Sequence, residues 1–255
     1  MNLTIDIGNS SIKVGVFHFE EGKYPGRNVS SPISTTRIGF DELETFDTFL
    51  NSYSINACIL STTSKIPQWL YSTLKSHNIN FIKELNASDN LPIKNRYKTP
   101  STLGTDRIAS VVGGYYLACK NNPVLCVDLG TAITYDFITA DGEYLGGNIS
   151  PGLSIRFKSL HDYTSKLPLL DKTGDIPDLG YNTSTAIRSG VILGLKNELQ
   201  GYIDEYQSKY PDLYIFLTGG DALYFDYPTK KRIFVEENLV LKGLNIILHY
   251  ILSKK

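Results

Sequence analysis

One segment of this chain occurs twice, and this repetition constrains the fold more than any other feature of the sequence. The first copy, MNLTIDIGNSSIKVGVFHF, covers residues 1–19, and the second, VLCVDLGTAITYDFI, covers residues 124–138. When the copies are superposed, Asp6 falls on Asp128 and the glycines that follow them coincide. In each copy an apolar strand runs into Asp-X-Gly, turns through small residues and returns as a second strand. The repeat therefore predicts two similar halves, each opening on a β-hairpin.

The length and the hydrophobic pattern define the predicted domains. The 255 residues suffice for two halves, which we predict to be 1–118 and 119–255. Between the hairpins, short apolar runs such as 57–60 alternate with segments of helical spacing such as the one that begins at Thr105. This alternation predicts an α/β fold in which each half has a mostly parallel or mixed sheet flanked by helices.

The pattern also predicts particular helices and one long loop. Ser64 is the expected N-cap of a helix that has Pro67 in its first turn. Residues 86–102 lack an apolar period and contain two prolines, so we expect a long loop there. Further helices are predicted at about 40–50, 185–210 and 239–252.

Composition excludes several classes of function. The formal net charge is −1, and Lys and Arg are spread along the chain, which argues against a nucleic-acid or membrane surface. The three cysteines form no CxxC pair and indicate structural thiols in a reducing cytosol. We see no signal peptide at the first residues and no apolar run near the ~18 residues of a membrane span. A cytoplasmic protein is therefore expected.

The first hairpin has residue types that suit a phosphate-binding loop. Gly8 permits a tight turn and close approach of a ligand, and Lys13 offers a point charge for a phosphate. Asp6, at the end of its strand, could hold Mg²⁺ directly or through water. One such hairpin could also be an ordinary turn with a solvent-facing lysine. The second copy at Asp128 favours phosphate binding, because turn chemistry alone does not explain two buried strands that both end in Asp-X-Gly.

Gly104-Thr105-Asp106-Arg107 is the strongest candidate for the chemical step. Asp106 could be a general base for a substrate hydroxyl, with Arg107 binding an anion or a carbonyl. It could equally be a helix-capping residue paired with Arg107, and the residue pattern leaves both readings open.

Other catalytic and nucleotide-binding signatures are missing. The sequence has neither GxxxxGK[ST] nor GxGxxG after a strand, so it supports neither a P-loop nor a dinucleotide-binding fold. The four histidines are isolated and lack the spacing of metal ligands. The segment 218–222, TGGDA, follows an apolar run, and its glycines would permit close approach of a nucleotide.

Five motifs taken together resemble the type III pantothenate kinase family. They are DIGNSSIK, GTDR, DLGTAITYDF, GGNISPG and TGGDA, in this order. That family belongs to the actin-like ATPase superfamily, with the sugar kinases, acetate kinase and heat-shock chaperones. The resemblance implies two ribonuclease H-like halves with ATP in the cleft between them. It also implies phosphorylation of pantothenate by ATP, the first step of coenzyme A synthesis.

The resemblance further implies roles for individual residues. Asp106 would accept the proton of the primary hydroxyl of pantothenate, and Asp128 would bind a monovalent cation, K⁺ or NH₄⁺. The phosphates of ATP, with Mg²⁺, would be bound by Asp6, Ile7, Gly8, Asn9, Ser10, Ser11, Ile12 and Lys13, with Thr131 as a further contact to ATP. Pantothenate would be contacted by Tyr97, Gly104, Thr105, Asp106, Arg107 and, from the neighbouring subunit of a homodimer, Thr183.

Two other functions stay open at the level of sequence. A regulator or accessory protein that binds ATP without catalysis could share the fold. Such a protein would not need to retain Asp106, Arg107 and Lys13, which this chain has. A kinase of another small alcohol is the second alternative, and only the resemblance favours pantothenate over it.

Overall fold

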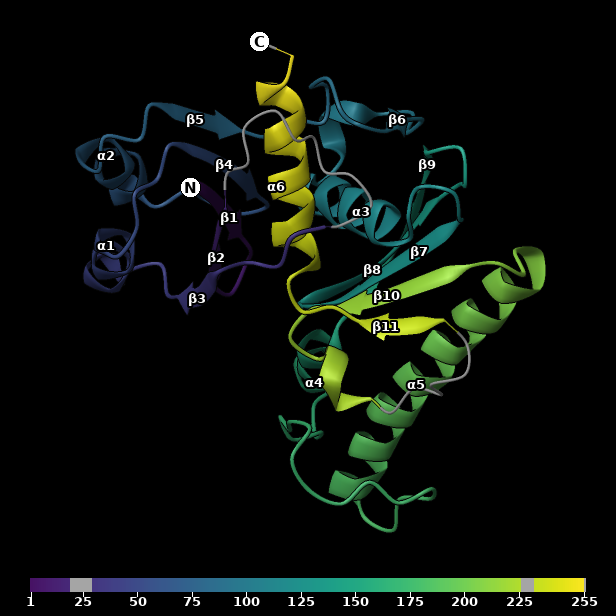
Figure 1. Ribbon diagram of the computed structural model, residues 1–255. Coiled ribbons are helices and arrows are strands. Elements are labelled where there is room, and N and C mark those ends of the chain that lie inside the picture. The colour runs from purple at the N-terminus through teal and green to yellow at the C-terminus, as the bar shows by residue number, and fades with distance from the viewer. Residues whose placement is uncertain (19–28, 226–231, 255) are drawn as a thin grey trace. The chain divides into compact units, whose positions relative to one another are not determined.

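The computed structural model describes residues 1–18, 29–225 and 232–254, so Phe19, the last residue of the first repeat copy, lies outside it (Figure 1). The strands are β1 (Asn2–Ile7), β2 (Ile12–Phe17), β3 (Ser34–Ile38), β4 (Ala57–Thr62), β5 (Phe81–Glu84), β6 (Lys94–Asn95), β7 (Val124–Leu129), β8 (Ala132–Ile138), β9 (Glu143–Pro151), β10 (Tyr214–Thr218) and β11 (Ile233–Val235). The α-helices are α1 (Leu43–Asn51), α2 (Gln68–Ser76), α3 (Thr105–Leu117), α4 (Leu153–Asp162), α5 (Thr183–Lys209) and α6 (Leu239–Leu252).

The chain divides into two compact units, neither of which is continuous in sequence. The first consists of residues 1–126, 136–146 and 238–255, and the second of residues 127–135 and 147–237. This division follows compactness, whereas the predicted halves, 1–118 and 119–255, follow the sequence repeat. The boundary at 118 stays a prediction about the duplication.

The first unit is built on a mixed five-stranded sheet of order β3-β2-β1-β4-β5. β1 pairs antiparallel with β2 and parallel with β4, and β4 pairs parallel with β5. Alternate residues of β1 point to opposite faces of the sheet. Leu3 and its alternating neighbours join a core that includes Phe46 of α1 and Leu70 of α2. On the other face, Asn2 donates a hydrogen bond to Asn245 of α6 (3.0 Å). Helices therefore cover both faces of this sheet, as Figure 1 shows.

Helices α3 and α6 of the first unit approach each other so closely that their contact surface requires glycine. An added Cβ at Gly243 would collide with the carbonyl oxygen of Ala109, and one at Gly113 would lie 2.6 Å from the carbonyl oxygen of Leu239. Side chains are absent where the backbones meet, so the two helices pack backbone to backbone. Figure 1 shows α6 running beside α3.

The two copies of the repeat form equivalent strands. β7 lies in a six-stranded sheet of order β11-β10-β7-β8-β9-β6. β1 and β7 have the same burial pattern, in which only the fifth of six residues is partly exposed. That residue is Asp6 in β1 and Asp128 in β7. The predicted equivalence of the two aspartates is thus confirmed at the level of the strands.

Two local predictions need correction. Ser64 is not a helix N-cap, because its backbone N–H donates to Thr62 Oγ1 (3.2 Å) and its carbonyl accepts from the same hydroxyl (2.6 Å). These bonds close a turn, so α2 begins only after Pro67. The predicted loop 86–102 also contains short strand β6, which pairs parallel with β9, and a 3₁₀ turn at Pro100–Thr102.

Other helix predictions are close to the observed bounds. The long helix begins at Thr183 rather than 185, because the side chain of Asn182 accepts from the backbone of Thr185 in a capping box. The last helix covers Leu239–Leu252, as predicted.

Candidate active site

The candidate site lies at the carboxyl ends of two parallel strands of the first unit. The register pairs Asp6 of β1 with Ser61 of β4. The Ser61 hydroxyl donates to Asp6 Oδ1 at 2.6 Å and so fixes the carboxylate. One residue on, the backbone N–H of Thr62 donates to Thr105 Oγ1 at 3.2 Å, which brings the first turn of α3 to the same edge. The carboxyl edge of parallel strands is where α/β folds commonly bind ligands.

The hairpin turn after Asp6 exposes some of its predicted binding residues and buries others. The Gly8 N–H donates to the Ser11 carbonyl at 3.1 Å and closes the turn. Asn9 and Ser10 are exposed, and Ser11 and Lys13 are partly exposed. The side chains of Ile7 and Ile12 are fully buried in the core. At those two positions only the backbone could contact a phosphate.

The carboxyl group of Asp6 is desolvated and therefore hard to ionise. Burial raises the pKa of Asp6 from 3.8 to about 6, while the bond from Ser61 lowers it. The negative charge of Asp106 raises it further, and the positive charge of Lys13 lowers it. A desolvated carboxylate beside a second carboxylate fits Mg²⁺, because that ion takes one or two carboxylates and keeps water and phosphate oxygens as its other ligands.

We expect Asp6→Asn to stabilise the ligand-free protein at neutral pH. A raised acid pKa means that ionising Asp6 costs the folded state more than the unfolded state. This cost is absent below about pH 4, grows as the pH rises and is complete above about pH 6. The variant should gain about 2 kcal/mol in the free energy of unfolding at pH 7.5, and clearly less at pH 5. Urea unfolding at the two pH values measures it.

The exposed Asp41 provides the control for this experiment, because Asp41→Asn removes a carboxylate without relieving burial. It should leave the free energy of unfolding unchanged at both pH values. A loss of stability in Asp6→Asn at pH 7.5, or the same gain at pH 5, would contradict the assigned cause.

Asp106 lies in the first turn of α3 and is partly exposed. Its Oδ1 accepts the backbone N–H of Arg107 at 2.8 Å. Burial raises the pKa of Asp106, the bond from Arg107 N lowers it, and the charge of Asp136 raises it. A carboxylate with a raised pKa that keeps access to solvent is suited to accept a proton. A Cβ at Gly104 would collide with Asp106 Oδ1, so a larger residue there would displace this carboxylate.

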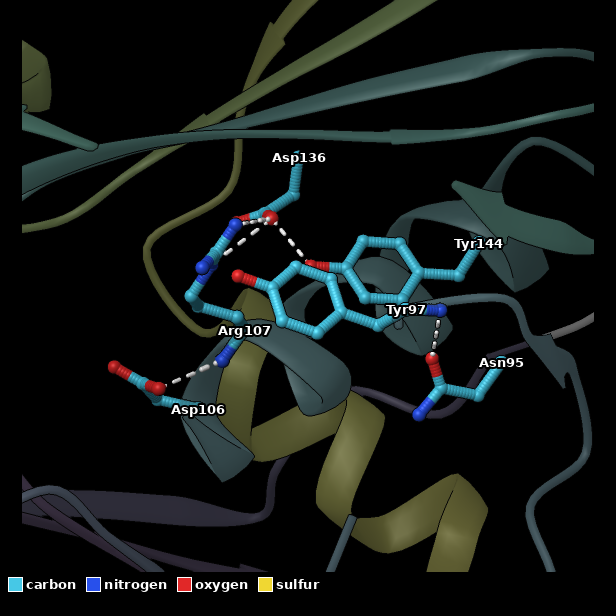
Figure 2. A network of polar contacts seen from close by, with 6 residues as sticks. All are labelled: Asn95, Tyr97, Asp106, Arg107, Asp136 and Tyr144. Carbon is cyan, nitrogen blue, oxygen red and sulfur yellow. Dashed lines mark hydrogen bonds and ion pairs between the residues drawn. The ribbon is translucent and has the colours of Figure 1, made fainter. Parts of the chain in front are cut away.

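The capping interpretation of Asp106 is wrong in both of its parts. The N-cap residue of α3 is Gly104, which makes no side-chain cap. The guanidinium of Arg107 pairs instead with Asp136 of β8, through Nε (3.0 Å) and Nη2 (2.6 Å) to Oδ1. The Asp106 carboxylate is therefore not committed to an ion pair with its neighbour, and Figure 2 shows it pointing away from that guanidinium.

Tyr97, which the family resemblance assigns to the substrate together with Arg107, lies next to this ion pair. Its ring stacks on Tyr144 with centroids 6.3 Å apart, and the Arg107 guanidinium carbon lies 5.7 Å from the centroid of the Tyr97 ring. Asn95 Oδ1 accepts the backbone N–H of Tyr97 at 3.0 Å (Figure 2). The predicted loop residues Tyr97, Gly104, Thr105, Asp106 and Arg107 are thus brought together within one unit.

Two residues of this cluster, Asp136 and Tyr144, were missed by the sequence reasoning. Asp136 is fully buried and accepts a hydrogen bond from the Tyr144 hydroxyl at 2.7 Å. A signal for Asp136 was present, since an aspartate inside the apolar run of a strand must have a partner. The sequence held no comparable signal for Tyr144.

The second unit holds the other predicted residues around the equivalent aspartate. Gly219 has φ +92°, and an added Cβ would lie 2.5 Å from Asp128 Oδ1. The backbone N–H of Asp221 donates to the Leu129 carbonyl at 3.0 Å, so the TGGDA segment lies against the end of β7. Thr131 is exposed, and its carbonyl accepts from Gly152 N at 3.1 Å. The turn of the second hairpin therefore contacts Gly152, the last residue of GGNISPG, while Gly219 of TGGDA lies against Asp128.

Thr183, the remaining predicted substrate contact, is the first residue of α5 and is exposed in the second unit. Within the described residues, no group of three or more His, Cys, Asp or Glu side chains could hold a metal ion by itself. The described helices include none that is long and apolar enough to cross a membrane.

Comparison with known proteins gives consistent matches. The sequence profile of the type III pantothenate kinases matches residues 2–205. The type III pantothenate kinase of Phocaeicola vulgatus is 42% identical over 250 residues, which cover 98% of each chain. A Campylobacter jejuni structure described as a candidate Baf family transcriptional activator has a TM-score of 0.56 at 22% identity, and the match covers 98% of this chain and 99% of that one. The glucokinase of an Antarctic psychrotroph has a TM-score of 0.52 at 10% identity, with 98% of each chain covered.

The two structural matches establish the fold alone, because their sequence identities are low. They confirm the predicted architecture, a mixed α/β fold with two sheets flanked by helices, which this chain shares with the two structures.

Proposed function

This chain belongs to the type III pantothenate kinase family, and we propose on that premise that it phosphorylates pantothenate with ATP, the first step of coenzyme A synthesis. The observation that carries the proposal is the position of Asp106. Its carboxylate has a raised pKa, keeps access to solvent and lies beside the Arg107 and Tyr97 cluster. A family match without these groups would suit a regulator as well as an enzyme.

Asp106 orients the primary hydroxyl of pantothenate and accepts its proton as the reaction proceeds. The hydroxyl oxygen forms a bond to the γ-phosphorus of ATP, and the bond from that phosphorus to the β,γ-bridging oxygen breaks, which leaves ADP. Catalysis of this transfer is mainly positioning and charge stabilisation, so the base need not be strong. Arg107 holds a polar or anionic part of the substrate, and Tyr97 contributes the aromatic wall beside it.

The hairpin 6–13 binds the phosphates of ATP. Its exposed Asn9 and Ser10 and the charge of Lys13 suit phosphate oxygens, and Asp6 would hold the divalent cation. Mg²⁺ bound there supplies charge neutralisation at the phosphates. The charge of a bound cation offsets the cost of ionising the buried Asp6 carboxylate.

We assign Asp128 to a monovalent cation, K⁺ or NH₄⁺, and Thr131 to ATP. Asp128→Asn should then raise the K⁺ concentration needed for half-activation by at least about tenfold, the lower range for loss of one supporting group at a metal site. Asp6→Asn should impair the use of Mg·ATP, and the remaining turnover should keep the K⁺ dependence of wild type. Kinase rates measured over a K⁺ titration test this division, and identical K⁺ curves for Asp128→Asn and wild type would contradict it.

A homodimer in which Thr183 contacts the neighbour's substrate follows from the family resemblance. Exposed apolar side chains near the start of α5 support it, since Leu179 is 85% and Tyr181 69% accessible in the single chain. Sedimentation velocity at micromolar protein concentration would contradict the proposal if it gave only a monomer. The cytoplasmic location also follows from the family's metabolic role and remains a prediction.

A coupled assay for ADP release tests the proposed function directly. Pantothenate is compared with a panel of sugars and polyols, with and without K⁺, and the product is identified by mass. Turnover of pantothenate alone is the expected result. Turnover of another alcohol would support a kinase with a different substrate, and ATP binding without any turnover would support the regulator.

A further inference from the structure

We infer that Asp136 is a positioning residue for the pantothenate-binding groups, and that it acts on Arg107 directly and on Tyr97 through Tyr144. This inference rests on the proposed function of the same site. None of the sequence motifs had given Asp136 or Tyr144 a role.

The first step is the orientation of the guanidinium. Asp136 Oδ1 accepts from Arg107 Nη2 at 2.6 Å and from Nε at 3.0 Å, while Oδ2 accepts from Nε at 3.2 Å. Such two-point pairing fixes the plane of the guanidinium as well as its position. Arg107 is 6% accessible and Asp136 is not accessible, so solvent does not compete for these bonds. Nη1 makes none of these three bonds. Because Asp136 fixes the plane of the guanidinium, it also sets the position of Nη1.

The second step connects Asp136 to Tyr97. The Tyr144 hydroxyl donates to Asp136 Oδ1 at 2.7 Å, and the two tyrosine rings lie parallel within 7°. The Tyr97 ring also packs against Gly146, where an added Cβ would lie only 3.3 Å from Cδ2 of the ring. Figure 2 shows the carboxylate, the guanidinium and both rings as one continuous group. A single carboxylate thus orders two substrate contacts that come from different segments.

The second unit contains a similar cluster of one arginine, one carboxylate and one tyrosine hydroxyl, none of which was proposed to contact the substrate. There Glu198 accepts from Arg156 Nη2 at 2.6 Å and from the Tyr135 hydroxyl at 2.9 Å. Neither Arg156 nor Tyr135 was assigned to a substrate. Glu198→Gln is therefore a matched control for Asp136→Asn.

The experiment compares Asp136→Asn, Tyr144→Phe and Glu198→Gln in the full chain. We measure kcat, the KM for pantothenate, the KM for ATP and the melting temperature. Asp136→Asn should raise the KM for pantothenate about 10–100-fold, the range seen when an orienting partner is lost at metal sites, and leave the KM for ATP unchanged. Tyr144→Phe should change the same constant in the same direction but less. Glu198→Gln should lower the melting temperature without changing either KM.

A double-mutant cycle shows whether Asp136 acts through Arg107. In an Arg107→Ala background, Asp136→Asn should cause a much smaller rise in the KM for pantothenate, because only its effect on Tyr97 through Tyr144 remains. A folded Asp136→Asn variant with the wild-type KM would overturn the inference, and so would an equal rise in the Arg107→Ala background. If Asp136→Asn does not fold, the Tyr144→Phe variant is the test. A wild-type KM for pantothenate in that variant would also overturn the inference. Wild-type protein that fails to turn over pantothenate would overturn the proposed function itself, whereas these outcomes leave it standing.

Discussion

Replacing Asp106 by asparagine should lower kcat by about 10²–10⁴-fold, the contribution of a positioned general base. The asparagine oxygen can still accept the backbone N–H of Arg107, so the first turn of α3 should keep its geometry. The lost property is the capacity to accept the proton of the substrate hydroxyl. The KM for ATP should stay near the wild-type value, because the residues proposed to bind ATP are those of the hairpin 6–13 and Thr131 and do not include Asp106. Steady-state kinetics at saturating ATP and pantothenate measure the effect.

Asp89 offers a closely matched control for this variant. Its Oδ2 accepts the backbone N–H of Asn86 at 2.8 Å, the distance of the bond from Arg107 N to Asp106, and its Oδ1 also pairs with Lys83. Asp89→Asn removes such a carboxylate away from the site, and this variant should keep full turnover. If Asp106→Asn is folded and turns over within a few-fold of wild type, Asp106 is not the base.

Gly243→Ala should have the largest effect on stability of any single methyl group added to the first unit. The new Cβ would collide with the Ala109 carbonyl oxygen, and neither backbone can rotate out of the way as a side chain could. Forcing a methylene into a packed core costs typically 1–3 kcal/mol, and a clash between two helix backbones should reach or exceed about 3 kcal/mol. Chemical denaturation with circular dichroism detection gives the loss in the free energy of unfolding.

Gly201→Ala is the control, because it makes the same substitution at a helix position that has open space beside it. Nothing lies within 4 Å of an added Cβ at Gly201 of α5. Removal of a glycine from a helix interior should stabilise the protein there by about 0.5–1 kcal/mol. Equal effects of the two variants would mean that α3 and α6 do not pack through Gly243.

The sequence predicts the hairpins and most helices because their signals are local. The strand pattern around Asp6 and Asp128 repeats with its turn residues, and the burial of β1 and β7 agrees with it. The predicted start of α2 was wrong, and the reason is equally local. Ser64 has two possible hydrogen-bonding roles, and the turn with Thr62 is the one that forms.

The partner of Arg107 could not be found in the same way. Asp106 is its neighbour in sequence, whereas Asp136 is 29 residues away and reaches it only because β8 passes α3 in the folded unit. Tyr144 joins the cluster across a further strand, and nothing in the sequence around it distinguishes a buried hydroxyl from any other core tyrosine. The family resemblance predicts roles for individual residues, whereas the contacts that hold those residues form only when distant segments meet in the fold.

The place of α6 in the first unit has a consequence for synthesis on the ribosome. Residues 238–255 complete a unit that begins at residue 1, and Asn2 and Asn245 are hydrogen-bonded although the whole second unit separates them in the chain. Domains usually fold as they emerge, starting from the N-terminus. Here the sheet that carries Asp6 must wait, with part of one face uncovered, until the second unit has been translated and α6 follows it. We therefore expect nascent chains that stop before residue 238 to be bound by chaperones and to be sensitive to protease in their first 126 residues.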